Sequence, residues 1–177
     1  MFRLASSGHT HYSGEKKVTE FRVIAIPTRV AKLVQTTQMS PGYGHPAHTE
    51  LATGYGPCRH CLRTFRVGEE QRILFTYDPF YGIEQIPLPG PVYVHAEMCK
   101  RHHEEAGYPD DMLAHAAVLQ GYAKGQRLIA REIVEDAQHV AAVQRLLARE
   151  DIDYIEVRDK IAGCYDFRIE RKQASDQ

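Results

Sequence analysis

The chain has 177 residues, of which 43% are hydrophobic, enough for one domain that buries a sizeable core. Its 22 Lys and Arg residues nearly balance its 23 Asp and Glu residues, so no overall charge directs it to nucleic acid or to an anionic membrane. No apolar run is long enough to span a membrane, and residues 1–20 lack the apolar core of a signal peptide. We therefore expect a soluble cytoplasmic protein. The sequence identifies no partner and no oligomeric state.

The hydrophobic pattern divides the chain into three parts. Residues 1–19 are polar without helical or strand periodicity, which predicts a flexible tail. Residues 20–171 are expected to form a single α+β domain. Residues 172–177 are polar again and are expected to fray.

The first half of this domain alternates short elements with irregular chain. Residues 21–26 predict a strand, and Thr28 is expected to cap a helix that runs to about Gln38. The stretch 40–57 is rich in glycine and proline and leads directly into the first cysteine pair. A long irregular stretch of this kind is often functional.

The next predicted elements lie on either side of His95 and Cys99. Residues 72–77 and 92–95 predict strands, and alternation in the second places Val92 and Val94 on one face and His95 on the other. We expect a short helix over 97–105 and another turn or two of helix from Pro109.

The last third predicts a strand over 127–134 and a packing helix capped by Asp136. A terminal hairpin of strands 152–157 and 165–169 follows. Helices and strands are mixed without a regular βαβ repeat. The fold class we expect is therefore α+β, a single compact domain with a mainly antiparallel sheet and two or three packed helices.

The cysteines carry the strongest chemical signal. Four are too few for a disulfide scaffold, and clustered cysteines in a reducing cytosol are more often metal ligands or catalytic thiols. Cys58 and Cys61 are two residues apart in a turn, so both thiolates can face one ion. His95 and Cys99 share one side if the chain between them is helical. Together these four residues predict a metal site with zinc favoured, although thiolates also suit iron.

Three further residues are candidates for the site. Cys164 lies on the more polar face of the last predicted strand, where a packing role is as good an explanation as a functional one. His60 adds positive charge beside the cysteine pair when it is protonated. Arg158 could bind an anion or orient a ligand, and a surface ion pair is its simplest role. An alternative pairing joins Cys99 to His102 or His103 at helical spacing.

Three motifs follow one another along the chain: Pro57-Cys58-Arg59-His60-Cys61-Leu62, then Gly90-Pro91-Val92-Tyr93-Val94-His95-Ala96-Glu97-Met98-Cys99, then Val157-Arg158 with Gly163-Cys164-Tyr165. In this order and at about these separations, the chain from about residue 21 to residue 171 resembles the bacterial family called domain of unknown function 1203. The resemblance implies bacterial origin, a single small domain and no assigned reaction. It also implies that Cys58, Cys61, His95, Cys99 and Cys164 belong to the shared pattern.

The sequence leaves two classes of function open. Four bound ligands would close the coordination shell and make the metal structural, in a binding or interaction protein. Three would leave an open position for a metal-dependent hydrolase or lyase. The other class is a thiol-disulfide oxidoreductase or redox sensor in which Cys58 and Cys61 cycle and Cys99 or Cys164 resolves. The sequence identifies no catalytic residue outside this cluster.

Overall fold

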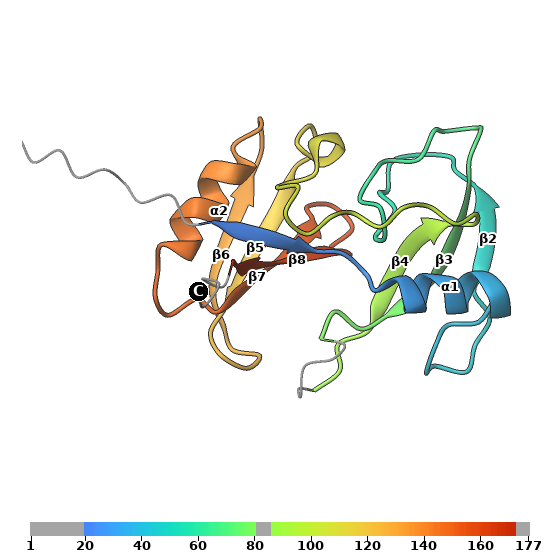
Figure 1. Ribbon diagram of the computed structural model, residues 1–177, viewed down its shortest axis with the longest axis horizontal. Helices are drawn as coiled ribbons and strands as arrows, with labels where there is room; N and C mark the ends of the chain where they lie inside the picture. Colours follow the sequence, from blue (N-terminus) through green and yellow to red (C-terminus); the bar gives the residue numbers. More distant parts are fainter. Residues whose placement is uncertain (1–19, 81–85, 173–177) are drawn as a thin grey trace, which may run out of the picture.

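Two antiparallel sheets, each with one helix against it, lie side by side in the computed structural model (Figure 1). The structure describes residues 20–80 and 86–172, so the predicted tail 1–19 and nearly all of the tail 172–177 lie outside the described residues. Within these ranges the chain forms eight strands, two α-helices and one short 3-10 helix over Asp110–Met112. None of the described helices is long and apolar enough to cross a membrane. The α+β class and the antiparallel pairing are confirmed, with two α-helices.

The larger sheet has the strand order β1-β8-β7-β5-β6. Its β7-β8 hairpin is the one predicted from the sequence, and Ile155 pairs with Ile169 across it. Helix α2 covers one face, where Val143, Leu146 and Leu147 join an aliphatic core. The bounds are β1 Phe21–Ile24, β5 Ala117–Tyr122, β6 Leu128–Val134, α2 His139–Leu147, β7 Tyr154–Asp159 and β8 Tyr165–Arg171.

The smaller sheet has the order β2-β3-β4, with β2 at His48–Leu51, β3 at Gln71–Tyr77 and β4 at Gly90–His95. Helix α1 (Thr28–Thr37) buries Val30, Ala31 and Val34 in the same core cluster as Ile73 and Phe75 of β3. Cys58 and Cys61 belong to this cluster too. The core of the small sheet therefore contains thiols.

The sequence prediction does not include strands β5 and β2, because the residues of β5 favour a helix and those of β2 lie in a stretch rich in glycine and proline. Strand β5 was not predicted, since Ala117, Leu119 and Gln120 favour helices and burial on both faces removes the alternation of a strand. It is nevertheless the central partner of β6 and β7. Strand β2 lies within the predicted irregular stretch 40–57 and is short, largely exposed and paired only with β3 among the described strands.

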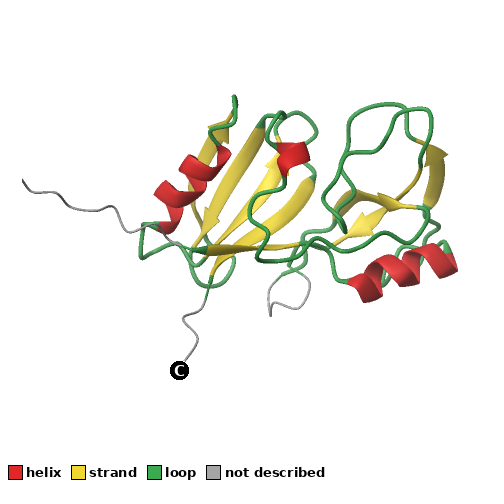
Figure 2. Ribbon diagram, turned by 45° about the horizontal axis from the view of Figure 1, so that its top comes forward, coloured by secondary structure: helices red, strands yellow, loops and turns green. Residues whose placement is uncertain are grey.

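The predicted helix over 97–105 is wrong. Its backbone bonds reach other segments, with the His102 N–H donating to the His60 carbonyl and the Glu104 carbonyl accepting from the Val23 N–H. The Arg101 guanidinium donates to the carbonyls of Ala25 and Ile26. The segment is thus held by long-range contacts in an irregular path, shown among the loops between the two sheets in Figure 2.

The two predicted helix caps also differ. Asp136 has a φ of 51° and lies outside α2, which begins at His139 after Gln138. Thr28 is the first residue of α1, whose cap position is Pro27, and its hydroxyl contacts His60. The Thr28 side chain therefore contacts His60 in the turn that holds Cys58 and Cys61, instead of capping the helix.

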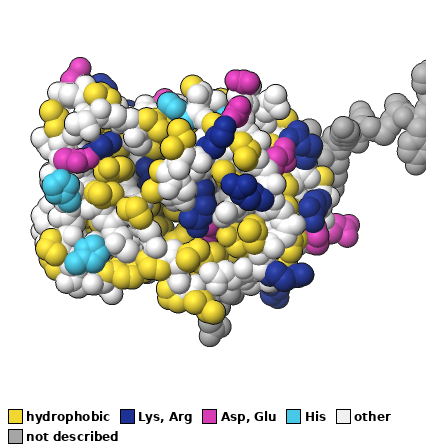
Figure 3. All heavy atoms as spheres, turned by 180° about the vertical axis from the view of Figure 1, so that it is seen from behind, with side chains coloured by type: hydrophobic (Ala, Val, Ile, Leu, Met, Phe, Trp, Pro, Cys, Tyr) yellow, Lys and Arg dark blue, Asp and Glu magenta, His cyan; other side chains and the backbone are white. Residues whose placement is uncertain are grey.

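The two halves differ in surface charge on the side seen from behind. Lys and Arg side chains gather over the five-stranded sheet in this view, and few lie over the three-stranded sheet (Figure 3). Several of the arginines on the large sheet pair with carboxylates, as Arg158 does with the buried Glu156 and Arg168 with Glu170. The large sheet thus carries paired charges on the face opposite α2.

Candidate metal centre

The Cys58–Cys61 pair lies in a tight turn closed by an isolated bridge between Pro57 and Thr64. Inside it the Cys58 N–H donates to the Arg63 carbonyl, and the Leu62 N–H donates to the Cys58 carbonyl. Leu62 has a φ of 56°, a conformation that costs a non-glycine residue energy and persists only when its surroundings impose it. The turn therefore holds both thiols on one side, and no helix follows it.

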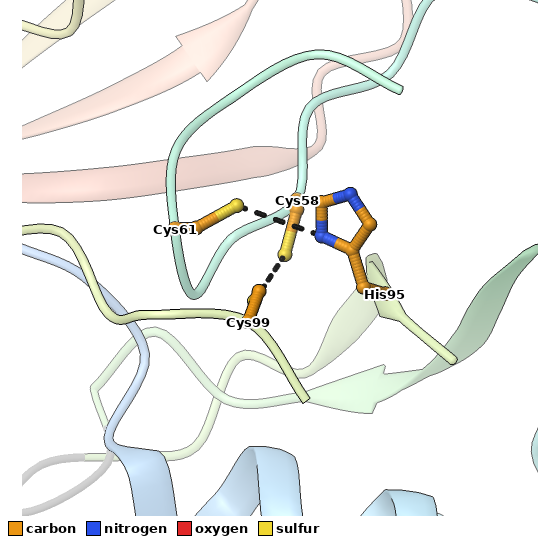
Figure 4. Close-up of side chains that lie close together, drawn as sticks. All are labelled: Cys58, Cys61, His95 and Cys99. Carbon is orange, nitrogen blue, oxygen red and sulfur yellow. Dashed lines mark hydrogen bonds between the residues drawn. The ribbon is translucent and has the colours of Figure 1, made fainter. Parts of the chain in front are cut away.

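His95 and Cys99 come to this turn from the other direction. His95 is the last residue of β4, and its ring lies 4.5 Å from the Phe65 ring between centroids. Cys99 follows in the irregular segment after β4. The two approach the cysteine pair without the helix expected from their spacing. Figure 4 shows the four side chains pointing toward one another from three separate pieces of chain.

The distances within the cluster fit a small tetrahedral ion. Cys58 Sγ lies 3.8 Å from Cys99 Sγ, and Cys61 Sγ lies 3.5 Å from His95 Nδ1. All four ligand atoms lie within 4.8 Å of one another. A tetrahedral zinc, with bonds of about 2.3 Å to sulfur and about 2.0–2.1 Å to nitrogen, separates its ligand atoms by about 3.5–3.8 Å. The cluster could therefore hold a metal ion.

The pKa shifts within the cluster show which protons a metal ion would have to displace. Hydrogen bonds from Cys58 and Cys99 lower the pKa of the Cys61 thiol, whereas hydrogen bonds with Cys58 and Cys61 raise the pKa of Cys99. Burial lowers the pKa of His95, but its hydrogen bonds with Cys58 and Cys61 outweigh burial and raise that pKa to about 10. These pKa shifts favour a thiolate at Cys61 beside a protonated His95, and they disfavour a second thiolate at Cys99. A divalent cation would remove that opposition and release protons as it binds.

Both ends of the cluster have outer partners that orient the ligand atoms. Glu70 Oε2 lies 3.5 Å from His95 Nε2, and the same oxygen accepts from the Arg66 N–H at 2.8 Å. A carboxylate on the far nitrogen of a histidine fixes the ring so that Nδ1 faces a metal. His60 Nδ1 lies 3.2 Å from Cys99 Sγ, and its Nε2 lies 3.0 Å from Thr28 Oγ1. Burial lowers the pKa of His60, so a neutral ring can donate to Cys99 and accept from Thr28.

A buried ion pair attaches the turn to the large sheet. Arg59 lies 2.9 Å from Asp166 of β8, and both side chains are at most 3% exposed. The Arg59 guanidinium also donates to the carbonyls of Tyr165 and Pro57. Its backbone N–H and carbonyl bond to Tyr93 and Ile26. The residue after Cys58 therefore joins both sheets.

The remaining candidates lie outside the cluster. Cys164 does not join the four ligand atoms. It is half-buried and lies immediately before β8, outside the predicted strand position, and its thiol is 3.9 Å from the Ala162 carbonyl. Arg158 pairs with Glu156 and donates to Gln120 and to the Gly163 carbonyl. His60 touches the cluster through Cys99 only as a hydrogen-bond partner. Glu70 was missed, because a contact across 25 residues leaves no local pattern.

The fold and the cluster define the class of this protein: an α+β protein with two antiparallel sheets and a group of three cysteines and one histidine beside the turn that joins them. Residues 55–171, more than half of the chain, match the family model described as protein of unknown function (DUF1203). The chain belongs to this family. The match begins at residue 55 and includes all four cysteines. No curated protein and no solved structure matches the chain.

Proposed function

We propose that Cys58, Cys61, His95 and Cys99 bind one zinc ion in a closed tetrahedral site, and that this zinc is structural in a protein that acts by binding. The observation that carries the proposal is the approach of four soft ligand atoms to within 4.8 Å of one another. Three sulfurs and one nitrogen are a common donor set of structural zinc. Zinc supplies a fixed tetrahedral cross-link and a positive charge when bound.

The positions of the ligands favour a structural role. They come from the tight turn, the end of β4 and the irregular segment that follows β4, and strand pairing does not join these pieces to one another. Four protein ligands leave no coordination position for water or substrate, so hydrolase or lyase chemistry has less support. Three thiolates with one zinc carry a net negative charge, and the Arg63 guanidinium, whose pKa is raised by Cys61, would offset it.

A thiol-disulfide oxidoreductase using Cys58 and Cys61 is the alternative. Redox pairs gain a low thiol pKa from the N-terminus of a helix, and the turn here is followed by irregular chain. The thiol of Cys58 also has Cys99 as a neighbour, with 3.8 Å between the two Sγ atoms, so the cysteines form a cluster rather than an isolated pair. These observations favour a metal over a reversible disulfide. Thiolate ligands also persist best in a reducing compartment, so we place the protein in the bacterial cytoplasm.

The test is to purify the full chain without a polyhistidine tag or chelator and to measure its metal content together with its free thiols. We expect about one zinc per chain, with Cys164 titrating alone until a chelator exposes the other three thiols. Absence of metal together with a Cys58–Cys61 disulfide would overturn the zinc proposal in favour of redox chemistry. One iron per chain would keep the site and replace the ion.

A further inference from the structure

A pocket of about 410 Å³ lies beside the metal centre, where the two sheets meet. Its walls come from three places: the chain that enters the cysteine turn, the outer face of β3 and β4, and the tip of the β7-β8 hairpin. This volume is within the range of about 300–1,000 Å³ typical of small-molecule sites. The residues that define its character are Tyr55, Leu74, Tyr93, Asp159, Ile161 and Cys164.

The pocket is apolar and aromatic, and its walls are fixed by contacts outside it. Tyr55 stacks on His115 with 3.6 Å between ring centroids, and Tyr93 lies under the Arg72 guanidinium at 4.0 Å. Leu74 pairs with Tyr93 across β3 and β4. Two anchored rings and a leucine form a preorganised surface for a planar, apolar group.

The charge that remains in the pocket is negative. Arg59 is neutralised by Asp166, and Arg158, near the hairpin tip, is paired with Glu156. Asp159 accepts from the N–H groups of Ile161 and Ala162 through Oδ1. No described cation forms an ion pair with it. Its second oxygen is therefore free to accept from a ligand.

We propose that this pocket binds a small ligand with a planar apolar body and a cationic amino group. The body would lie against Tyr55 and Tyr93, and the amino group would donate to Asp159. Such a ligand would bury apolar area against the two tyrosine rings and form a charge-assisted hydrogen bond with the Asp159 carboxylate. The inference rests on the proposed zinc only for the position of one wall, since Pro57 and Arg59 flank the ligand Cys58.

Three probes of one shape and different charge test the proposal on the full chain as purified: benzylamine, benzyl alcohol and benzoate. Binding is followed in ¹H–¹⁵N spectra at the amides of Gly56, Ala162 and Cys164. We expect benzylamine to shift these amides and to bind about tenfold more tightly than benzoate, with benzyl alcohol between them.

Asp159→Asn removes the charge and keeps the oxygen that accepts from the hairpin N–H groups. We expect it to weaken benzylamine about tenfold and to leave benzyl alcohol nearly unchanged. The matched control is Asp153→Asn, an exposed aspartate in the loop before β7, which should change nothing. Ala162→Trp, at the exposed hairpin tip, should block all three probes by filling the pocket.

Equal binding of benzylamine and benzoate, or full benzylamine affinity in Asp159→Asn, would overturn the proposal. Zinc content of the same samples is read separately. Metal present without benzylamine binding contradicts the pocket proposal alone. Benzylamine binding without metal contradicts the zinc proposal alone.

Discussion

The five-stranded and the three-stranded sheet differ in the side chains that make up their core clusters. Behind the larger sheet lie aliphatic and aromatic side chains such as Leu119, Ile155 and Phe167, all fully buried. The core cluster of the smaller one includes the buried Cys58 and Cys61 as well as Val34 and Phe75. The large half can close its core by hydrophobic burial, whereas the small half places reactive groups where packing alone would favour leucine or valine.

The three-stranded half is therefore the part of the chain that needs an additional source of stability. Three strands and one ten-residue helix make a small core, and small cores commonly depend on a metal or a disulfide. The connections after β4 lack regular structure and depend on long-range contacts. We therefore expect the three-stranded half to depend on the metal and the five-stranded half to be largely independent of it.

The largest effect should follow from Cys61→Ser. Losing one thiolate removes the closed shell, and structural zinc supplies folding free energy on the order of 10 kcal/mol. We expect loss of zinc and loss of hydrogen-exchange protection in β3 and β4, with protection in β7 and β8 retained. The control is Cys164→Ser, since that thiol lies outside the cluster. Equal loss of protection in both sheets would contradict the proposed independence of the larger half.

Breaking the link between the halves should have the next largest effect. Arg59→Met leaves the Asp166 carboxylate buried without its partner, which costs about 3–5 kcal/mol. Burial raises the pKa of Asp166 to about 6 even though Arg59 opposes it, so a protonated Asp166 is within reach at mildly acidic pH. The free energy of unfolding from urea titration should therefore fall less at pH 5 than at pH 7. An undiminished loss at pH 5 would rule out the unpaired charge as the cause.

A smaller effect is expected at the outer partner of His95. Glu70→Gln removes the carboxylate charge near Nε2, and outer partners of this kind are worth about 10–100-fold in metal affinity. Zinc affinity is measured by competition with a chromophoric chelator. Glu69→Gln is the matched control in the same turn, because Glu69 is 67% exposed and pairs only with Arg66 among the described residues. Equal losses of zinc affinity in the two variants would show that Glu70 does not support His95.

The smallest expected effect is the loss of stability on acidification that comes from His139 in the five-stranded half. Burial lowers the pKa of His139 below its ordinary 6.5, so the unfolded chain binds more protons than the folded one as pH falls below that value. Stability from this group is therefore complete above pH 6.5 and is lost on acidification, by at most about 1.4 kcal/mol per pH unit. His139→Gln can still donate to the His115 carbonyl and should flatten this slope. An unchanged slope would assign the acid sensitivity to other groups.

The sequence predicted the grouping of Cys58, Cys61, His95 and Cys99 better than the fold around them. The structure brings these four residues together, and the spacing of Cys58 and Cys61 and the step from His95 to Cys99 are local patterns that the sequence shows. The helix predicted to bring Cys99 to the side of His95 is absent, and long-range hydrogen bonds hold the segment after Cys99 instead. Cys164 shares the family motif but lines the neighbouring pocket, a placement that depends on the hairpin tip meeting β3 and β4.

Elements with strong periodicity were predicted, and elements stabilised by their neighbours were missed. The β7-β8 hairpin follows from alternating residues and a turn. Strand β5 could not be inferred from propensity, because its strand form comes from pairing with β6 and β7 on both sides. Gly121 within it shows the tightness of that packing, since a Cβ there would lie 2.7 Å from Ile152.

X-ray absorption at the zinc edge, on the protein as purified, tests the closed four-ligand zinc site most directly. A closed zinc site gives three sulfur neighbours at about 2.3 Å and one nitrogen at about 2.0–2.1 Å. An added oxygen neighbour in place of a sulfur would show an open site and restore the case for hydrolytic chemistry. A shell of nitrogen and oxygen alone would contradict zinc binding by Cys58, Cys61, His95 and Cys99.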